Sequence, residues 1–176
     1  DRAKEILMAL DEVSNSALVN KVGVSVQSPQ KDLPVVFEHI KPTLIQSPYN
    51  ILDDGLVSSG WAKILKSMGC EIHTRSTFLQ GLLIMEKTER PKWFERWHHY
   101  LKAWDDWLEV EEINALDACL RFVLSCEDID LCIVGVNSLE QLQRLLSVEK
   151  EPLNSLPKWP SGKPIELVNP SLWRHR

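Results

Sequence analysis

The sequence of 176 residues lacks several features that mark specialised classes of protein. Its 20 basic residues are scattered among 25 acidic ones and the net charge is -5, so no basic field attracts a phosphate backbone, and nucleic acid is not an expected partner. No apolar run reaches the roughly 20 residues that cross a bilayer, and the amino terminus has no signal-peptide layout. These absences favour a soluble, cytoplasmic protein without a membrane partner.

Cysteine is scarce and irregularly spaced. The four cysteines form no C-x-x-C pair and fall in stretches with helical or strand character, at Cys70, Cys119, Cys126 and Cys132. Reduced, buried thiols are therefore the favoured interpretation, and no metal site is expected. The adjacent His98 and His99 do not change this expectation, because neighbours on a helix point in different directions.

An initiator methionine is also missing. The chain opens with "DRAKEILMAL", already inside an amphipathic helical pattern, which indicates a fragment of a longer protein or a processed product. What the chain does have is an apolar content of 44%, enough to bury the core of one folded domain.

Apolar runs rich in Val, Ile and Leu alternate with helical patterns. The runs predict strands at residues 21–26, 42–46, 70–74 and 131–136. Helical periodicity predicts helices at residues 3–12, 28–40, 56–68, 91–108 and 112–126, and after the N-cap Ser138. This alternation is typical of a parallel sheet built from βα units, and the lack of apolar/polar alternation predicts that both sheet faces are covered.

The βα units are expected to occupy residues 1–150, with a tryptophan-rich helical insertion near residues 91–108. Its indoles lie largely on one helical stripe, which indicates anchoring to the body or to another chain, or alternatively a lid over the substrate. Residues 151–176 are rich in proline and predict an extended tail. Four apolar side chains are candidates to pin this tail: Leu153, Leu156, Trp159 and Trp173.

Polar residues or glycine occur at or just beyond the carboxyl end of each predicted strand. They are Ser25, Gln46, the pair Arg75 and Ser76, and Gly135. In parallel α/β architectures this edge of the sheet binds ligands, because loops and helix amino termini present free N–H groups there. The pattern predicts a ligand site formed by four strand ends.

Four segments carry a resemblance to a known family: "KVGVSV", "IQSPYNILD", "GCEIHTRSTFLQGLL" and "IVGVNSLEQLQRLL". In this order and spacing, residues 3–147 resemble the second half of an aldo-keto reductase, strands five to eight of its (β/α)8 barrel. The resemblance implies an α/β protein of TIM-barrel type. It would be present here as a half barrel of about four parallel βα units with a helical insertion and an extended tail.

In that family the second half supplies most contacts to the nicotinamide cofactor, so the resemblance implies NADP or NAD. Ser25 and Gln46 match the residues that hold the carboxamide, although Val26 stands where many members have asparagine. Arg75 matches a Tyr, Trp or Arg that stacks on the nicotinamide ring.

The resemblance also covers the phosphate-binding loops. Ser76 begins the loop that crosses the pyrophosphate, which continues through Phe78, Leu79 and Gly81. After strand eight, NADP-preferring relatives often have Lys and Arg for the 2′-phosphate, where this chain has Gly135 and Gln141. The possible substitutes are Asn137, Ser138 and Arg144.

The catalytic Asp, Tyr, Lys and His of the family come from the first half of the barrel, which no segment here resembles. The resemblance therefore implies a cofactor-binding half without catalytic residues, acting on a small-molecule carbonyl substrate only when the missing half completes it. The alternative is a non-catalytic half-barrel module that works through association. A half barrel leaves strand edges and an inner face uncovered, so we expect a homo-oligomer such as a homodimer, or association with the missing half.

Overall fold

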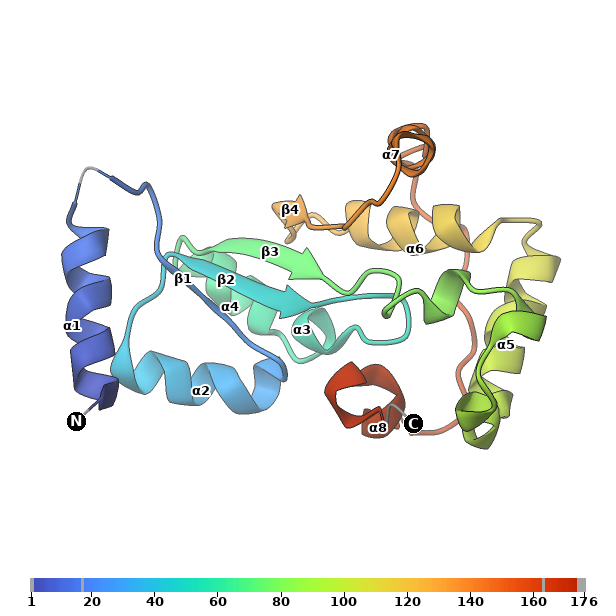
Figure 1. Ribbon diagram of the computed structural model, residues 1–176, viewed down its shortest axis with the longest axis horizontal. Coiled ribbons are helices and arrows are strands. Elements are labelled where there is room, and N and C mark those ends of the chain that lie inside the picture. Colours follow the sequence, from blue (N-terminus) through green and yellow to red (C-terminus); the bar gives the residue numbers. More distant parts are fainter. Residues whose placement is uncertain (1, 17, 163, 174–176) are drawn as a thin grey trace.

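The computed structural model describes residues 2–16, 18–162 and 164–173, and its four strands form one sheet (Figure 1). The strands are β1 (Gly23–Ser25), β2 (Leu44–Pro48), β3 (Glu71–Arg75) and β4 (Leu131–Cys132). All neighbours pair in parallel in the order β1-β2-β3-β4, with helices between successive strands. The predicted parallel α/β sheet is confirmed.

The helices follow the predicted segments with some changes in bounds. They are α1 (Arg2–Ser14), α2 (Pro29–His39), α3 (Gly55–Ser58), α4 (Trp61–Ser67), α5 (His98–Val110), α6 (Ala115–Leu124), α7 (Leu139–Leu146) and α8 (Ile165–Val168). Short 3-10 helices are η1 (Leu82–Ile84), η2 (Lys87–Glu89), η3 (Lys92–Trp97) and η4 (Pro170–Leu172). The single helix predicted at residues 56–68 is wrong: Gly60, with a φ of 83°, separates α3 from α4.

Two strands end more than one residue away from their predicted ends. β2 was expected to end at Gln46 but continues to Pro48, because the backbone N–H of Tyr49 still donates to the carbonyl of Arg75 at 3.1 Å. Gln46 therefore lies within its strand. β4 is shorter than predicted, since β3 ends at Arg75 and leaves residues 134–136 without a strand to pair with.

The sheet has one covered face and one open face. On the covered face Ile45 and Ile72 are fully buried, in a cluster with Leu33, Leu56, Leu65 and Val123 of the helices. On the open face Gln46 and His73 are half-buried, and Leu131 is 51% exposed. The expectation that both faces are covered is wrong, because the helices between the strands pack on one side only.

A second hydrophobic cluster holds the insertion after β3. The stretch predicted as one helix begins as the 3-10 helix η3 and continues as α5. Trp104 is fully buried, and its indole N–H donates to the carbonyl of Leu83 at 2.9 Å. The indole N–H of Trp107 donates to Ser155 Oγ in the carboxyl-terminal tail, also at 2.9 Å. The indoles thus anchor α5 to both the loop after β3 and the tail.

The tail is mostly extended but includes α8 and η4. Three of the side chains predicted to pin it pack against the second hydrophobic cluster: Leu153, Trp159 and Trp173. Leu156 does not, since it is 56% exposed. In the described part of the chain no helix is long and apolar enough to cross a membrane.

Gly23 allows the close approach of β1 to β2. A Cβ at this position would lie 2.4 Å from the carbonyl oxygen of Leu44, so we expect Gly23→Ala to lower the free energy of unfolding by about 1–3 kcal/mol. Gly135→Ala is the matched control, because its Cβ would meet nothing within 4 Å. Urea denaturation measures both, and an equal stability of the two variants would contradict the close packing of β1 on β2.

Candidate functional site

A cavity of about 560 Å³ lies beside the carboxyl ends of β3 and β4. Its walls come from the loop after β3 with Ile84 of η1, the segment after β4, Gln141 and Leu145 of α7, and Leu116 of α6. Seven of the predicted cofactor-binding residues line it: Arg75, Ser76, Phe78, Gly81, Gly135, Asn137 and Gln141. The structure therefore brings together, around one space, residues that are up to 66 positions apart (141 − 75).

The loop after β3 has an unusual backbone. Ser76, Leu79 and Gln80 are non-glycine residues with φ values of 63°, 47° and 55°, and Gly81 follows at 88°. Left-handed conformations of this kind cost L-residues free energy and concentrate at ligand-binding sites. The loop keeps these left-handed conformations because the Leu79 side chain is fully buried in the hydrophobic cluster and anchors the loop to it.

Asn50 fixes this loop to the loop after β2. Its side chain is fully buried, and Nδ2 donates to the carbonyl of Ser76 at 3.0 Å. Its Oδ1 accepts from the backbone N–H groups of Leu52 at 3.0 Å and Asp53 at 2.9 Å. The sequence prediction missed Asn50, although an asparagine that caps its own following turn is a recognisable pattern.

The guanidinium of Arg75 joins the ends of β1 and β3. Its Nη2 donates to the carbonyl of Val26 at 3.1 Å and to Gln27 Oε1 at 3.0 Å, and its Nη1 donates to Ser76 Oγ at 3.3 Å. Hydrogen bonds of a guanidinium lie in its plane, so these contacts do not use its two flat faces. Stacking of a planar ring on Arg75 would use those faces.

Ser25 and Gln46 are register partners across β1 and β2. The hydroxyl of Ser25 donates to Gln46 Oε1 at 3.4 Å, on the open face of the sheet. Neither residue lines the 560 Å³ cavity, but Ser25 directly precedes Val26, whose carbonyl accepts from Arg75. Arg75 thus connects this pair to the cavity.

The sequence matches the family model described as "Aldo/keto reductase family" over residues 2–156. The chain belongs to the aldo-keto reductase family. Two solved structures of aldo-keto reductase AKR11C1 from Bacillus halodurans, in its holo and apo forms, resemble the fold with TM-scores of 0.65 and 0.66 at 19% sequence identity. Comparison with curated proteins gives no match.

Each superposition covers 88% of this aldo-keto reductase chain but only 53% and 54% of the two solved chains. The chain therefore spans about half the length of the structures it resembles. With its four parallel strands and single covered face, it has the architecture of a half barrel of TIM type.

Aldo-keto reductases generally use NAD(P)H, and the cavity suits such a group. Gly135 lines the cavity, and a Cβ there would meet nothing within 4 Å, so the backbone faces open space. The polar groups around the space are the guanidinium of Arg75, hydroxyls and amides, and no carboxylate occurs among the described residues that line it. This set of donors fits an anionic pyrophosphate.

Some predicted residues of the aldo-keto reductase site have other contacts. The side chain of Leu79 is buried in the hydrophobic cluster and does not line the cavity. Ser138 Oγ accepts from the backbone N–H of Gln141 at 3.1 Å, which confirms its predicted role as the N-cap of α7. Arg144 donates to the carboxylate of Asp117 at 2.9 and 3.0 Å, and it does not line the cavity.

Eight residues that line the cavity were not predicted: Thr77, Gln80, Ile84, Leu116, Ile133, Val134, Val136 and Leu145. Thr77 and Gln80 belong to the coiled loop after β3, so their position next to predicted residues was the available signal. Leu116 lies in α6 and faces the cavity only because α6 packs against η1. No pattern in the sequence indicates that contact.

Both tyrosines of this aldo-keto reductase lie outside the cavity. Tyr49 is buried against Phe122, with ring centroids 5.0 Å apart, and burial raises its pKa. The hydroxyl of Tyr100 donates to the carbonyls of Ser161 and Gly162 in the tail. Tyr49 follows the end of β2 but its side chain lies in the core on the covered face, and Tyr100 is bound to the tail.

The four cysteines are free thiols. Cys70 and Cys119 are buried, and burial raises the pKa of each thiol. Among residues 2–16, 18–162 and 164–173, no three His, Cys, Asp or Glu side chains gather as a metal site. Cys119 serves as a small apolar group of the core, whereas Cys70 Sγ donates to the carbonyl of Pro42 at 2.8 Å and Cys132 Sγ lies 3.1 Å from Thr77 Oγ1.

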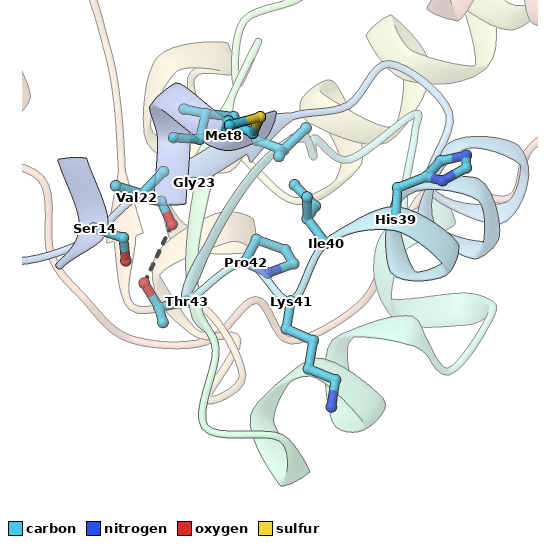
Figure 2. A pocket seen from close by; sticks show the side chains of 11 residues that line it. Met8, Ser14, Val22, Gly23, His39, Ile40, Lys41, Pro42 and Thr43 are labelled. Atoms are coloured by element: carbon cyan, nitrogen blue, oxygen red, sulfur yellow. Dashed lines mark hydrogen bonds between the residues drawn. The ribbon is translucent and has the colours of Figure 1, made fainter. Parts of the chain in front are cut away.

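A second cavity, of about 490 Å³, lies at the opposite, amino-terminal ends of β1 and β2 (Figure 2). Val22, Pro42 and Thr43 line it together with residues of α1, and Thr43 Oγ1 donates to the carbonyl of Val22 at 3.2 Å. Ligands of (β/α) folds bind at the carboxyl ends of the strands, where the helix amino termini lie. We therefore place the functional site in the first cavity.

Asn50→Ala should loosen the loop after β3. The substitution removes a buried amide, so the carbonyl of Ser76 and the other partners of Asn50 lose hydrogen bonds. We therefore expect the free energy of unfolding to fall by about 1–3 kcal/mol. Hydrogen exchange of residues 76–81 should also become faster. The exposed Asn154→Ala is the matched control, and unchanged exchange in the Asn50 variant would show that this amide does not position the loop.

Proposed function

We propose that this chain is the cofactor-binding, carboxyl-terminal half of an NAD(P)H-dependent aldo-keto reductase that reduces a carbonyl group. The observation that carries the proposal is the cavity lined by Arg75, Ser76, Gly81 and Asn137, with no carboxylate among the described residues around it. It lies at the edge of the sheet where ligands of this architecture bind. The family match supports the same conclusion.

Each part of the site has a proposed role in binding. Ser25 and Gln46 hold the carboxamide, since they are neighbours on the open face of the sheet. The flat face of Arg75 supports the ring, and the loop from Ser76 to Gly81 contacts the pyrophosphate. The bound cofactor supplies the hydride, and these residues orient it.

The proton for the carbonyl oxygen has to come from another part of the full barrel. Tyr49 and Tyr100 have structural contacts in this chain. The proposed catalytic protein therefore combines this half with a half that carries the acid, and the chain alone binds cofactor without turnover.

Exposed apolar groups at both edges of the half barrel support such an association. At the β4 edge, α7 exposes Leu139, Leu142 and Leu146, which lie on one helical face. At the β1 edge, Ile6 and Met8 of α1 are more than half exposed. Parallel strands at open edges also present unpaired backbone groups. We propose that the first half of a barrel covers these surfaces, and that the isolated chain covers them by forming a homodimer.

Titration with NADPH and NADH tests the cofactor site directly. The seven tryptophans report binding through fluorescence quenching, and we expect saturable binding that Gly135→Leu weakens at least about tenfold by filling the cavity. The control Gly135→Ala adds only a methyl group. Saturable binding that Gly135→Leu does not change would place the cofactor elsewhere, and no quenching at millimolar cofactor would contradict the proposal.

Sedimentation velocity tests the association. At micromolar concentration the chain should sediment as a dimer, because a monomer would expose the apolar groups of α1, α7 and β4 together. Charged substitutions on α7, in Leu142→Glu combined with Leu146→Glu, should shift the equilibrium towards monomer. A compact wild-type monomer that stays soluble would contradict self-association.

A further inference from the structure

Among the residues that the structure describes, no carboxylate contacts the guanidinium of Arg75. In the described part of the chain, none of the ion pairs includes Arg75. Its three acceptors are the Val26 carbonyl, the Gln27 side-chain carbonyl and the Ser76 hydroxyl, all neutral groups. The guanidinium is half-buried at the edge of the cavity, so water screens its charge only in part.

The acceptor Gln27 is itself held in place. Its backbone N–H donates to Asp32 Oδ2 at 2.8 Å, and the backbone N–H of Ser28 donates to the same oxygen at 2.7 Å. Asp32 lies in the first turn of α2, where a carboxylate also interacts favourably with the helix dipole. The carboxylate thus fixes the loop after β1 through backbone amides, and that loop orients the guanidinium.

A fixed cation at this position distinguishes the two redox states of a nicotinamide. The ring of the reduced cofactor is neutral, whereas the ring of the oxidised cofactor carries a positive charge. A guanidinium stacked on the ring repels the oxidised form and leaves the reduced form unaffected. An aromatic side chain in the same place would instead attract the cationic ring through its quadrupole.

We propose that Arg75, positioned by Gln27 and Asp32, makes the site selective for the reduced cofactor over the oxidised one. This inference rests on the proposed cofactor site. Its consequence is that the oxidised cofactor dissociates more readily than the reduced one, so the free site refills preferentially with NADPH. Arg75 sets this preference through its charge, and Gln27 and Asp32 are positioning residues.

Calorimetric titration of the full chain with NADPH and NADP+ tests the inference. The two ligands have the same phosphates and differ in the charge of the ring, so the ratio of their dissociation constants isolates that charge. We expect NADPH to bind about tenfold more tightly than NADP+. In Arg75→Tyr the dissociation constant of NADP+ divided by that of NADPH should fall to one or below. Arg75→Lys keeps the charge, so this variant should still bind NADPH more tightly than NADP+.

Two further variants keep the test decisive. Arg75→Gln removes the charge without introducing a ring, and it replaces the tyrosine variant if that protein does not fold. Gln27→Ala retains the charge but removes one acceptor, so the preference should shrink without disappearing. Circular dichroism of each variant verifies the fold.

The possible failures are distinguishable. Equal dissociation constants of NADPH and NADP+ in the wild type, or a ratio that Arg75→Gln leaves unchanged, would overturn the charge-based preference while the cofactor site stands. Absence of binding by either ligand would overturn the proposed cofactor site and the preference with it.

Discussion

The parallel pairing of β1, β2 and β3 is the constraint on which the site depends. Pairing aligns Ser25 with Gln46 and Gln46 with His73, so Arg75 lies two residues beyond that row at the carboxyl edge. From there its guanidinium reaches the loop after β1, and the chain that follows it coils around the cavity. A shift of one residue in register would turn Arg75 to the covered face of the sheet and separate these groups.

The same pairing leaves the half barrel incomplete in a specific way. Helices between parallel strands cover one face, so the other face carries the half-exposed Leu131 and the polar pair Glu71 and His73, whose largely buried side chains lie 2.6 Å apart. In a closed barrel that face is the interior. The resemblance to longer solved structures agrees with this architecture, since the chain covers only 53% and 54% of them. Cofactor binding and proton donation would thus belong to different halves of one barrel.

Much of the fold could be predicted from the sequence, because strand and helix periodicity are local properties. The four strands and their parallel order followed from such patterns, and resemblance to the family placed seven residues that line the cavity. The ends of the strands could not be predicted as well. Only the backbone hydrogen bond from Tyr49 to Arg75 shows that β2 continues beyond Gln46. The left-handed run at Leu79 and Gln80, and the buried amide of Asn50 that supports it, depend on contacts between distant segments. No local pattern encodes those contacts.

The central claim is that the carboxyl edge of β3 and β4, and not the opposite end of the sheet, holds the nicotinamide cofactor. Amide chemical shifts of the isotope-labelled chain, recorded with and without NADPH, test this claim most directly. We expect the largest changes in residues 75–81 and 135–141, the two segments that supply most of the lining of the larger cavity. Changes confined to residues 22–24 and 39–43 at the amino-terminal cavity, or no changes at saturating NADPH, would contradict it.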